Sequence, residues 1–150
     1  MYWEKYNPNP VRLNGEVGDC AVRAIAKALG ISWEEAYTKL SFNGYLMGDM
    51  PNSDLVWGSV LRSEGFIREV VPNTCPECYT VKNFCEDHPK GVFVVKSENH
   101  VATIVDGRLY DSWDSEMKIP IYYWTRKEQS NNGDLLQPNV SNTNGTAVRA

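Results

Sequence analysis

The spacing of apolar residues changes once along the chain, from a helical period in the first half to strand-like runs in the second. After Cys20 the apolar residues recur every three or four positions as far as Gly30, a glycine at the favoured position for ending a helix. Ser32 and Glu35 then form a capping-box pattern that opens a second helix. Helices are expected over residues 21–29, 32–40, 53–64 and 80–87, with a glycine-containing loop over residues 41–52.

The second half contains short β-rich runs that are separated by turn residues. Asp106 and Gly107 stand between two of these runs, and this dipeptide is typical of a two-residue hairpin loop. Strands are expected over residues 66–71, 91–97, 100–106, 108–113 and 119–124. The order of the elements predicts an α+β fold in which N-terminal helices pack on a C-terminal antiparallel β-sheet.

Length and composition indicate one domain, because 150 residues can bury a core without disulfides or metals. Residues 129–150 are polar and rich in Asn, which predicts a disordered tail after a single domain over residues 1–128. The net charge of −4 and the scattered Lys and Arg side chains argue against a nucleic-acid partner. No secretory signal or membrane-spanning stretch is apparent, so we expect a cytoplasmic protein with no membrane association.

Cys20 follows a Gly-Asp pair directly, at the predicted start of the first helix. The first turn of a helix exposes unpaired N–H groups and the positive end of the helix dipole, and both stabilise a thiolate. The position is therefore typical of a nucleophilic cysteine. The alternative is a small buried thiol at a contact between helices.

A histidine far along the chain can supply the base that such a nucleophile needs. His100 opens a predicted strand, and Asp111 or Asp114 on the next strand is available to orient its ring. If the hairpin loop has two residues, counting outward from it places Asp111 and Trp113 on the same face as His100. Asp114 then points away. The sequence therefore predicts that Cys20, His100 and Asp111 act together.

These residues resemble the papain-like cysteine peptidase superfamily. In papain-type enzymes a Gly-x-Cys turn places the nucleophile at a helix start, a later strand carries the His, and the next strand carries an Asn-Ser-Trp motif. Here Gly-Asp-Cys occupies residues 18–20, His100 begins a strand, and Asp-Ser-Trp occupies residues 111–113. The chain as a whole is also similar to small proteins of bacteriophages and their hosts.

The resemblance implies a papain-like fold with a Cys-His-Asp triad, in which His100 takes the proton of Cys20 and the thiolate attacks an acyl carbonyl. By the same match Asn14, six residues before the nucleophile, stands where the family has its oxyanion-hole Gln, and Trp113 shields the bond between Asp111 and His100. The implied function is a thiol hydrolase or acyl transferase that cleaves a peptide, isopeptide or amide bond in a protein or peptide substrate. Such a reaction requires no cofactor.

The alternative function is a non-catalytic interaction protein, papain-like or stabilised by zinc, for example a phage-encoded inhibitor of a host protein. Its zinc ligands would follow the pattern Cys-x2-Cys-x6-Cys-x2-His, which is formed by Cys75, Cys78, Cys85 and His88. Two such pairs can present four soft ligands to one tetrahedral Zn2+, so a structural zinc site is one interpretation. Thiols without a metal, with Cys85 in the core, and a redox pair of Cys75 and Cys78 are the others.

Overall fold

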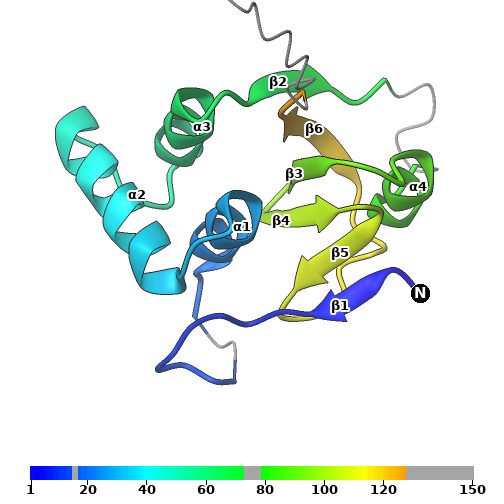
Figure 1. Cartoon of the computed structure of the whole chain (residues 1–150), viewed down its shortest axis with the longest axis horizontal. Coiled ribbons are helices and arrows are strands. Elements are labelled where there is room, and N and C mark those ends of the chain that lie inside the picture. The colour runs from blue at the N-terminus through cyan, green and yellow to red at the C-terminus, as the bar shows by residue number, and fades with distance from the viewer. Residues whose placement is uncertain (15–16, 73–78, 128–150) are drawn as a thin grey trace, which may run out of the picture.

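A computed structural model describes residues 1–14, 17–72 and 79–127 of the chain (Figure 1). The helices of this part are α1 (Cys20–Leu29), α2 (Trp33–Met47), α3 (Asp54–Ser63) and α4 (Val81–Asp87). Its strands are β1 (Trp3–Lys5), β2 (Ile67–Val70), β3 (Val92–Ser97), β4 (His100–Val105), β5 (Arg108–Asp111) and β6 (Pro120–Thr125). The tail expected over residues 129–150 lies outside the described residues.

The strands of the described residues form one mixed sheet in the order β1-β5-β4-β3-β6-β2. All neighbouring strands pair antiparallel except β1, which runs parallel to β5. The α+β class is therefore confirmed, but the expectation of a purely antiparallel sheet is wrong. The difference arises from β1, which no local pattern announces, because the distant Glu116 carboxylate holds it by accepting hydrogen bonds from the backbone N–H groups of Tyr2 and Trp3.

Helices cover both faces of the sheet (Figure 1). On one face α1 packs against β4 and lies between the sheet and α2. The small side chains of Ala21, Ala24 and Ala28 are buried there, and the Thr103 hydroxyl donates to the carbonyl oxygen of Ala24 at 2.8 Å. α4 covers the opposite face. No helix within the described ranges combines the length and the apolar character that a membrane crossing needs.

α2 is longer than the sequence pattern predicts. Its capping box is present, since Ser32 Oγ accepts a hydrogen bond from the Glu35 N–H at 3.1 Å. The helix then continues to Met47, where the sequence led us to expect a loop. Gly44 is buried within the helix, and it is Gly48, in the left-handed conformation at φ 67°, that ends it. The predicted loop is therefore wrong for residues 41–47, because Gly44 serves a close approach of the chain and not a turn.

Replacing Gly44 with alanine is expected to lower the free energy of unfolding by up to about 2 kcal/mol. A Cβ at this position would lie 2.7 Å from the carbonyl oxygen of Asp49, which is backbone and cannot swing aside. Overpacking of this kind costs about 1–3 kcal/mol, whereas the better helix propensity of alanine returns about 1 kcal/mol. Urea unfolding measures the difference. Gly18→Ala is the control, since a Cβ there meets no described atom within 4 Å, and equal losses in the two variants would contradict the prediction.

The hairpin between β4 and β5 has the predicted two-residue loop. Asp106 at φ 48° and Gly107 at φ 75° both adopt the left-handed conformation that a type I′ turn requires. Val105 pairs with Arg108, and the following pairs keep this register along both strands. The register predicted from the sequence is therefore confirmed, and it places the start of β4 and the end of β5 side by side.

Candidate active site

The start of α1 carries Cys20, whose side chain is only partly buried. Burial by itself would raise the pKa of this thiol. The His100 imidazole and the Val101 backbone outweigh that effect, with a smaller contribution from the charge of Arg23, and the pKa of Cys20 lies below its ordinary value. A side-chain interaction between the thiol and the His100 ring thus shifts the pKa values of both groups.

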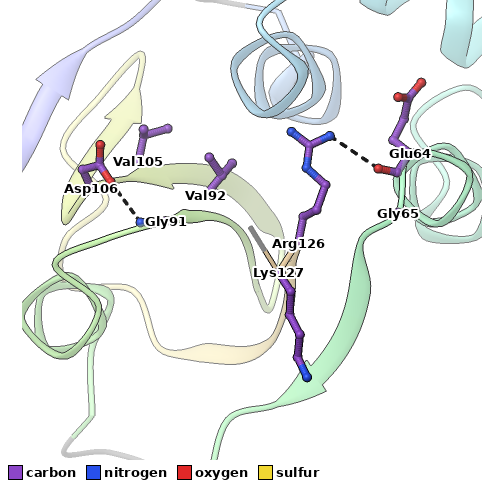
Figure 2. A pocket seen from close by; sticks show the side chains of 8 residues that line it. All are labelled: Glu64, Gly65, Gly91, Val92, Val105, Asp106, Arg126 and Lys127. Atoms are coloured by element: carbon purple, nitrogen blue, oxygen red, sulfur yellow. Dashed lines mark hydrogen bonds between the residues drawn. The ribbon is translucent and has the colours of Figure 1, made fainter. Parts of the chain in front are cut away.

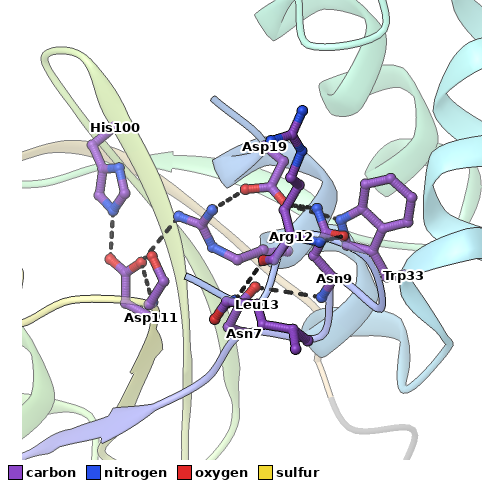
Figure 3. A network of polar contacts seen from close by, with 10 residues as sticks. Asn7, Asn9, Arg12, Leu13, Asp19, Trp33, His100 and Asp111 are labelled. Carbon is purple, nitrogen blue, oxygen red and sulfur yellow. Dashed lines mark hydrogen bonds and ion pairs between the residues drawn. The ribbon is translucent and has the colours of Figure 1, made fainter. Parts of the chain in front are cut away.

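His100 is the first residue of β4, and only 8% of its surface is exposed. Its Nε2 makes a short hydrogen bond with Oδ2 of Asp111 at the end of β5 (Figure 3). Burial works against a charged ring, but the Asp111 carboxylate and the neighbouring Cys20 outweigh it and raise the pKa of His100 to about 9. With Nε2 directed at Asp111, Nδ1 is the ring nitrogen left to exchange a proton with the thiol.

The Asp111 carboxylate is 1% exposed and fully engaged by donors. Beside His100, its Oδ2 accepts from the Ser115 hydroxyl at 2.6 Å. Its Oδ1 accepts from the Ser112 N–H at 2.8 Å and from Nη2 of Arg23 at 3.3 Å. Burial favours the neutral acid, yet the partners, His100 first among them, lower the pKa of Asp111 below its ordinary value. The group is therefore an anion that can hold the imidazolium.

Trp113 and Asn14, the two other predicted site residues, differ in their placement. The Trp113 indole lies against the His100 ring, with 4.9 Å between the ring centroids and 49° between the planes. It covers the imidazole while 43% of its own surface stays exposed. Asn14 is exposed on the segment before α1, and its side chain has no hydrogen-bond partner among the described residues. Its role in an oxyanion hole thus stays a prediction.

Asp19 and Arg23 are site residues that the sequence analysis missed. Both are 5% exposed, and the Asp19 carboxylate forms a short ion pair with Nη1 of Arg23. The other oxygen of Asp19 accepts from Nε1 of Trp33 at 2.9 Å and from Nδ2 of Asn9 at 3.2 Å. This explains the Gly-Asp pair before the cysteine, because Asp19 turns its side chain inward and makes no capping bond to α1. The signal was an arginine among the small apolar residues of a buried helix.

A groove of about 380 Å³ runs beside the start of α1. Gly18 and Asp19, which immediately precede Cys20, form part of its lining. Most of its wall is apolar and is contributed by Val11, Val17, Val22, Trp33, Tyr37 and Pro51. The groove can therefore accept an apolar side chain beside the two residues that precede Cys20. A larger hollow of about 650 Å³ between Gly65 and Gly91 is lined by neither cysteine nor histidine (Figure 2).

The predicted zinc ligands fall partly outside the described residues, where Cys75 and Cys78 lie. Cys85 is a buried residue of α4, and burial, helped by the charges of Glu116 and Glu86, raises the pKa of its thiol to about 12. The His88 ring stacks on the Phe84 ring, with 3.9 Å between the ring centroids. No cluster of three His, Cys, Asp or Glu side chains suited to a metal occurs in the part of the chain that the structure describes. The zinc site stays a prediction.

This site is supported by its geometry. Cys20, His100 and Asp111 are brought together as the sequence predicted, from one helix start and two adjoining strands. Trp113 also reaches the His100 ring, but from the bend that follows β5, because this strand ends at Asp111 and not at residue 113 as predicted. The chain matches no model of a known protein family, and neither a curated protein nor a solved structure is significantly similar to it.

Proposed function

We propose that the chain is a papain-like thiol hydrolase or acyl transferase that acts through Cys20, His100 and Asp111. The observation that supports it best is the pair of opposite pKa shifts, down at the thiol and up to about 9 at the imidazole. Together they favour a thiolate–imidazolium pair near neutral pH, which is the reactive form of a nucleophilic cysteine. The buried carboxylate of Asp111 stabilises the imidazolium and fixes the orientation of its ring.

In the proposed reaction the Cys20 thiolate forms a bond to the acyl carbon, and the carbonyl electrons move onto the oxygen. The N–H of Cys20, at the start of α1 where helix N–H groups have no helical acceptor, donates to this oxyanion, and Asn14 is the proposed second donor. The proton on His100 passes to the leaving amine as the C–N bond breaks, which leaves a thioester. Water that His100 deprotonates then hydrolyses the thioester, whereas an amine or hydroxyl acceptor gives acyl transfer.

The groove beside α1 supports a protein or peptide substrate over a small amide. Its lining reaches from Trp33 and Tyr37 on α2 to Gly18 and Asp19, directly before the nucleophile. An extended peptide with an apolar side chain near the scissile bond would bury that side chain against the stacked rings of Trp33 and Tyr37, whose centroids lie 5.1 Å apart. Binding there would hold the acyl group close to Cys20.

Iodoacetamide at pH 6 is expected to alkylate Cys20 at least about tenfold faster in the native chain than in the same chain unfolded in urea. An ordinary thiol with a pKa of about 8.5 is almost fully protonated at this pH, whereas a thiolate–imidazolium pair is not. Peptide mass spectrometry after timed quenching measures the rate at each cysteine. Cys20→Ala should remove this fast labelling and Cys85→Ser should leave it intact. A native Cys20 that reacts no faster than the unfolded one would refute the proposal.

The alternative, a non-catalytic interaction protein, is favoured by one observation on α2. Its second half exposes large apolar side chains to solvent, with Phe42 at 60%, Tyr45 at 82% and Leu46 at 64%. Contiguous apolar surface of this kind is typical of sites that bind other proteins. The two functions separate in a partner-binding assay, because a binding protein keeps its affinity in a Cys20→Ala variant and loses it when Tyr45 and Leu46 are changed to serine.

A further inference from the structure

We propose that Arg23 is a positioning residue of this site, which ties the carboxylate of Asp111 to the helix that carries Cys20. The inference deepens the proposed function and depends on it. In the reaction above, Arg23 contacts neither the leaving amine nor the acyl carbon of the substrate. It acts through Asp111, and through Asp111 on the ring of His100.

The guanidinium of Arg23 bridges two buried carboxylates. Nη1 pairs with Asp19, and Nη2 lies 3.3 Å from Oδ1 of Asp111. The two outer nitrogens of a planar guanidinium stand at a fixed separation, so the bridge sets the distance between the carboxylates. Nε, the third nitrogen, has no partner among the described residues, which leaves the two carboxylates as the groups that hold the side chain.

The bridge joins the separate elements of the site. Arg23 lies one turn after Cys20 on α1, whereas Asp111 ends β5. Asp19 is itself anchored, because Trp33 on α2 donates to it. A continuous series of polar contacts thus runs from His100 on the sheet, through Asp111, Arg23 and Asp19, to α2 (Figure 3). Movement of α1 relative to β5 would break this series, so the same contacts that hold Asp111 also hold the nucleophile in register with its base.

Arg23 also determines which oxygen of Asp111 faces the ring. The arginine and the Ser112 N–H occupy Oδ1, and this leaves Oδ2 to His100 and Ser115. Without the arginine, Oδ1 keeps a single donor, and the carboxylate is held less firmly against rotation about its χ2 bond. A rotated carboxylate no longer accepts from Nε2 in line, and the ring loses the orientation that points Nδ1 at the thiol.

The charges around Arg23 determine the direction in which its removal shifts the ionisation of Cys20. Asp19 faces the guanidinium from the residue before α1 and Asp111 from β5, with His100 on the far side of Asp111, while Cys20 lies on the same helix as Arg23. Burial raises the pKa of Tyr6, and the charge of Arg23 acts against that effect. Lys27, one turn later on α1, lies over the rings of Tyr6 and Tyr110. Removal of the one cation between two carboxylates leaves two negative groups near the developing thiolate. The thiolate then forms less readily.

The test is the pH dependence of Cys20 alkylation by iodoacetamide in the full chain, with Arg23→Gln and Arg23→Lys compared to the natural sequence. Arg23→Gln is expected to move the midpoint of the alkylation curve upward by about one pH unit and to slow labelling at pH 6 about threefold, which is less than the change in the thiolate fraction because a more basic thiolate is a better nucleophile. Arg23→Lys keeps the charge but cannot bridge both carboxylates, so a smaller upward shift is expected. Arg62→Gln on α3, an exposed arginine, is the matched control and should leave the midpoint unchanged.

A purely structural role for Arg23 gives a different result. The folded Arg23→Gln variant would then lose stability, yet its alkylation midpoint would equal that of the natural chain, and the inference would be overturned. If Arg23→Gln does not fold, Arg23→Lys decides, because an unshifted midpoint there overturns the inference as well. The readout needs no substrate and so separates the two proposals. A natural chain whose Cys20 titrates like an ordinary thiol refutes the function, whereas a low midpoint that Arg23→Gln does not move refutes the role of Arg23 alone.

Discussion

Replacing His100 with glutamine is expected to slow the alkylation of Cys20 at pH 6 by about 10- to 100-fold. The imidazole is the chief group that holds the pKa of the thiol below its ordinary value, and burial raises that pKa once the ring is gone. A thiol with a pKa of 8.5 or above is ionised to about 0.3% or less at pH 6. The rate falls by less than the thiolate fraction, because a more basic thiolate is also a better nucleophile.

The second histidine supplies the matched control for this experiment. His88→Gln changes the same residue type at a site where the ring stacks on Phe84, on the opposite face of the sheet from α1. Cys20 in the His88→Gln variant should be alkylated at the same rate as in the natural chain. Glutamine at position 100 retains an N–H that can donate to Asp111, so the fold is expected to persist and circular dichroism can verify it. An unchanged alkylation rate in a folded His100→Gln variant would contradict the assignment of the base.

Most of the triad could be predicted because its geometry depends on a short hairpin. Asp106 and Gly107 fix a two-residue loop, and the alternation of side chains along β4 and β5 then decides which carboxylate shares a face with His100. That reasoning selects Asp111 over Asp114, and the structure confirms it, since Asp111 and not Asp114 contacts the ring. A local turn and a period of two were sufficient, with no knowledge of the remaining fold.

The residues that support the triad could not be predicted, because their partners lie far apart in sequence. Arg23 and Asp111 are 88 positions apart, and nothing near either residue announces the other. The parallel strand β1 depends in the same way on Glu116, 113 residues after Trp3. Buried charges of this kind must find partners, so an arginine within the apolar face of a helix indicates that a carboxylate lies nearby without identifying which one.

The predicted loop is wrong for residues 41–47 because glycine has two different structural uses. A glycine in a sequence marks a break where the backbone needs a left-handed conformation, as Gly48 does, and equally marks a place where two backbones approach, as Gly44 does. The sequence alone does not separate these uses. The exposed apolar residues of the same stretch, such as Phe42 and Tyr45, gave no helical pattern facing a core, because they face solvent.

Replacing Asp111 with alanine is expected to lower the free energy of unfolding by about 3–5 kcal/mol near neutral pH. The substitution removes the acceptor of four donors at once, and it leaves His100 buried without a carboxylate partner and Arg23 with Asp19 alone. Leaving a charge buried and unpaired costs more stability than the small cavity alone would. Urea unfolding at several pH values measures it, in a Cys20→Ser background that removes the opposing titration of the thiolate.

The pH dependence of that loss distinguishes the ion pair from simple packing. Because His100 has a pKa raised from 6.5 to about 9 in the natural chain, its pairing with Asp111 stabilises the fold fully below pH 6.5 and fades as the pH rises toward 9. In the Cys20→Ser background it fades at a lower pH, since Cys20 also raises this pKa. Because the pKa of Asp111 is lowered from 3.8, the contribution of its charge is present above that pH and is lost on further acidification. The cost of Asp111→Ala should therefore be greatest between about pH 4 and 6.5 and smaller at pH 10. A cost that does not vary with pH would mean that Asp111 acts by filling space, and His100 would then lack the charged partner that the proposed chemistry requires.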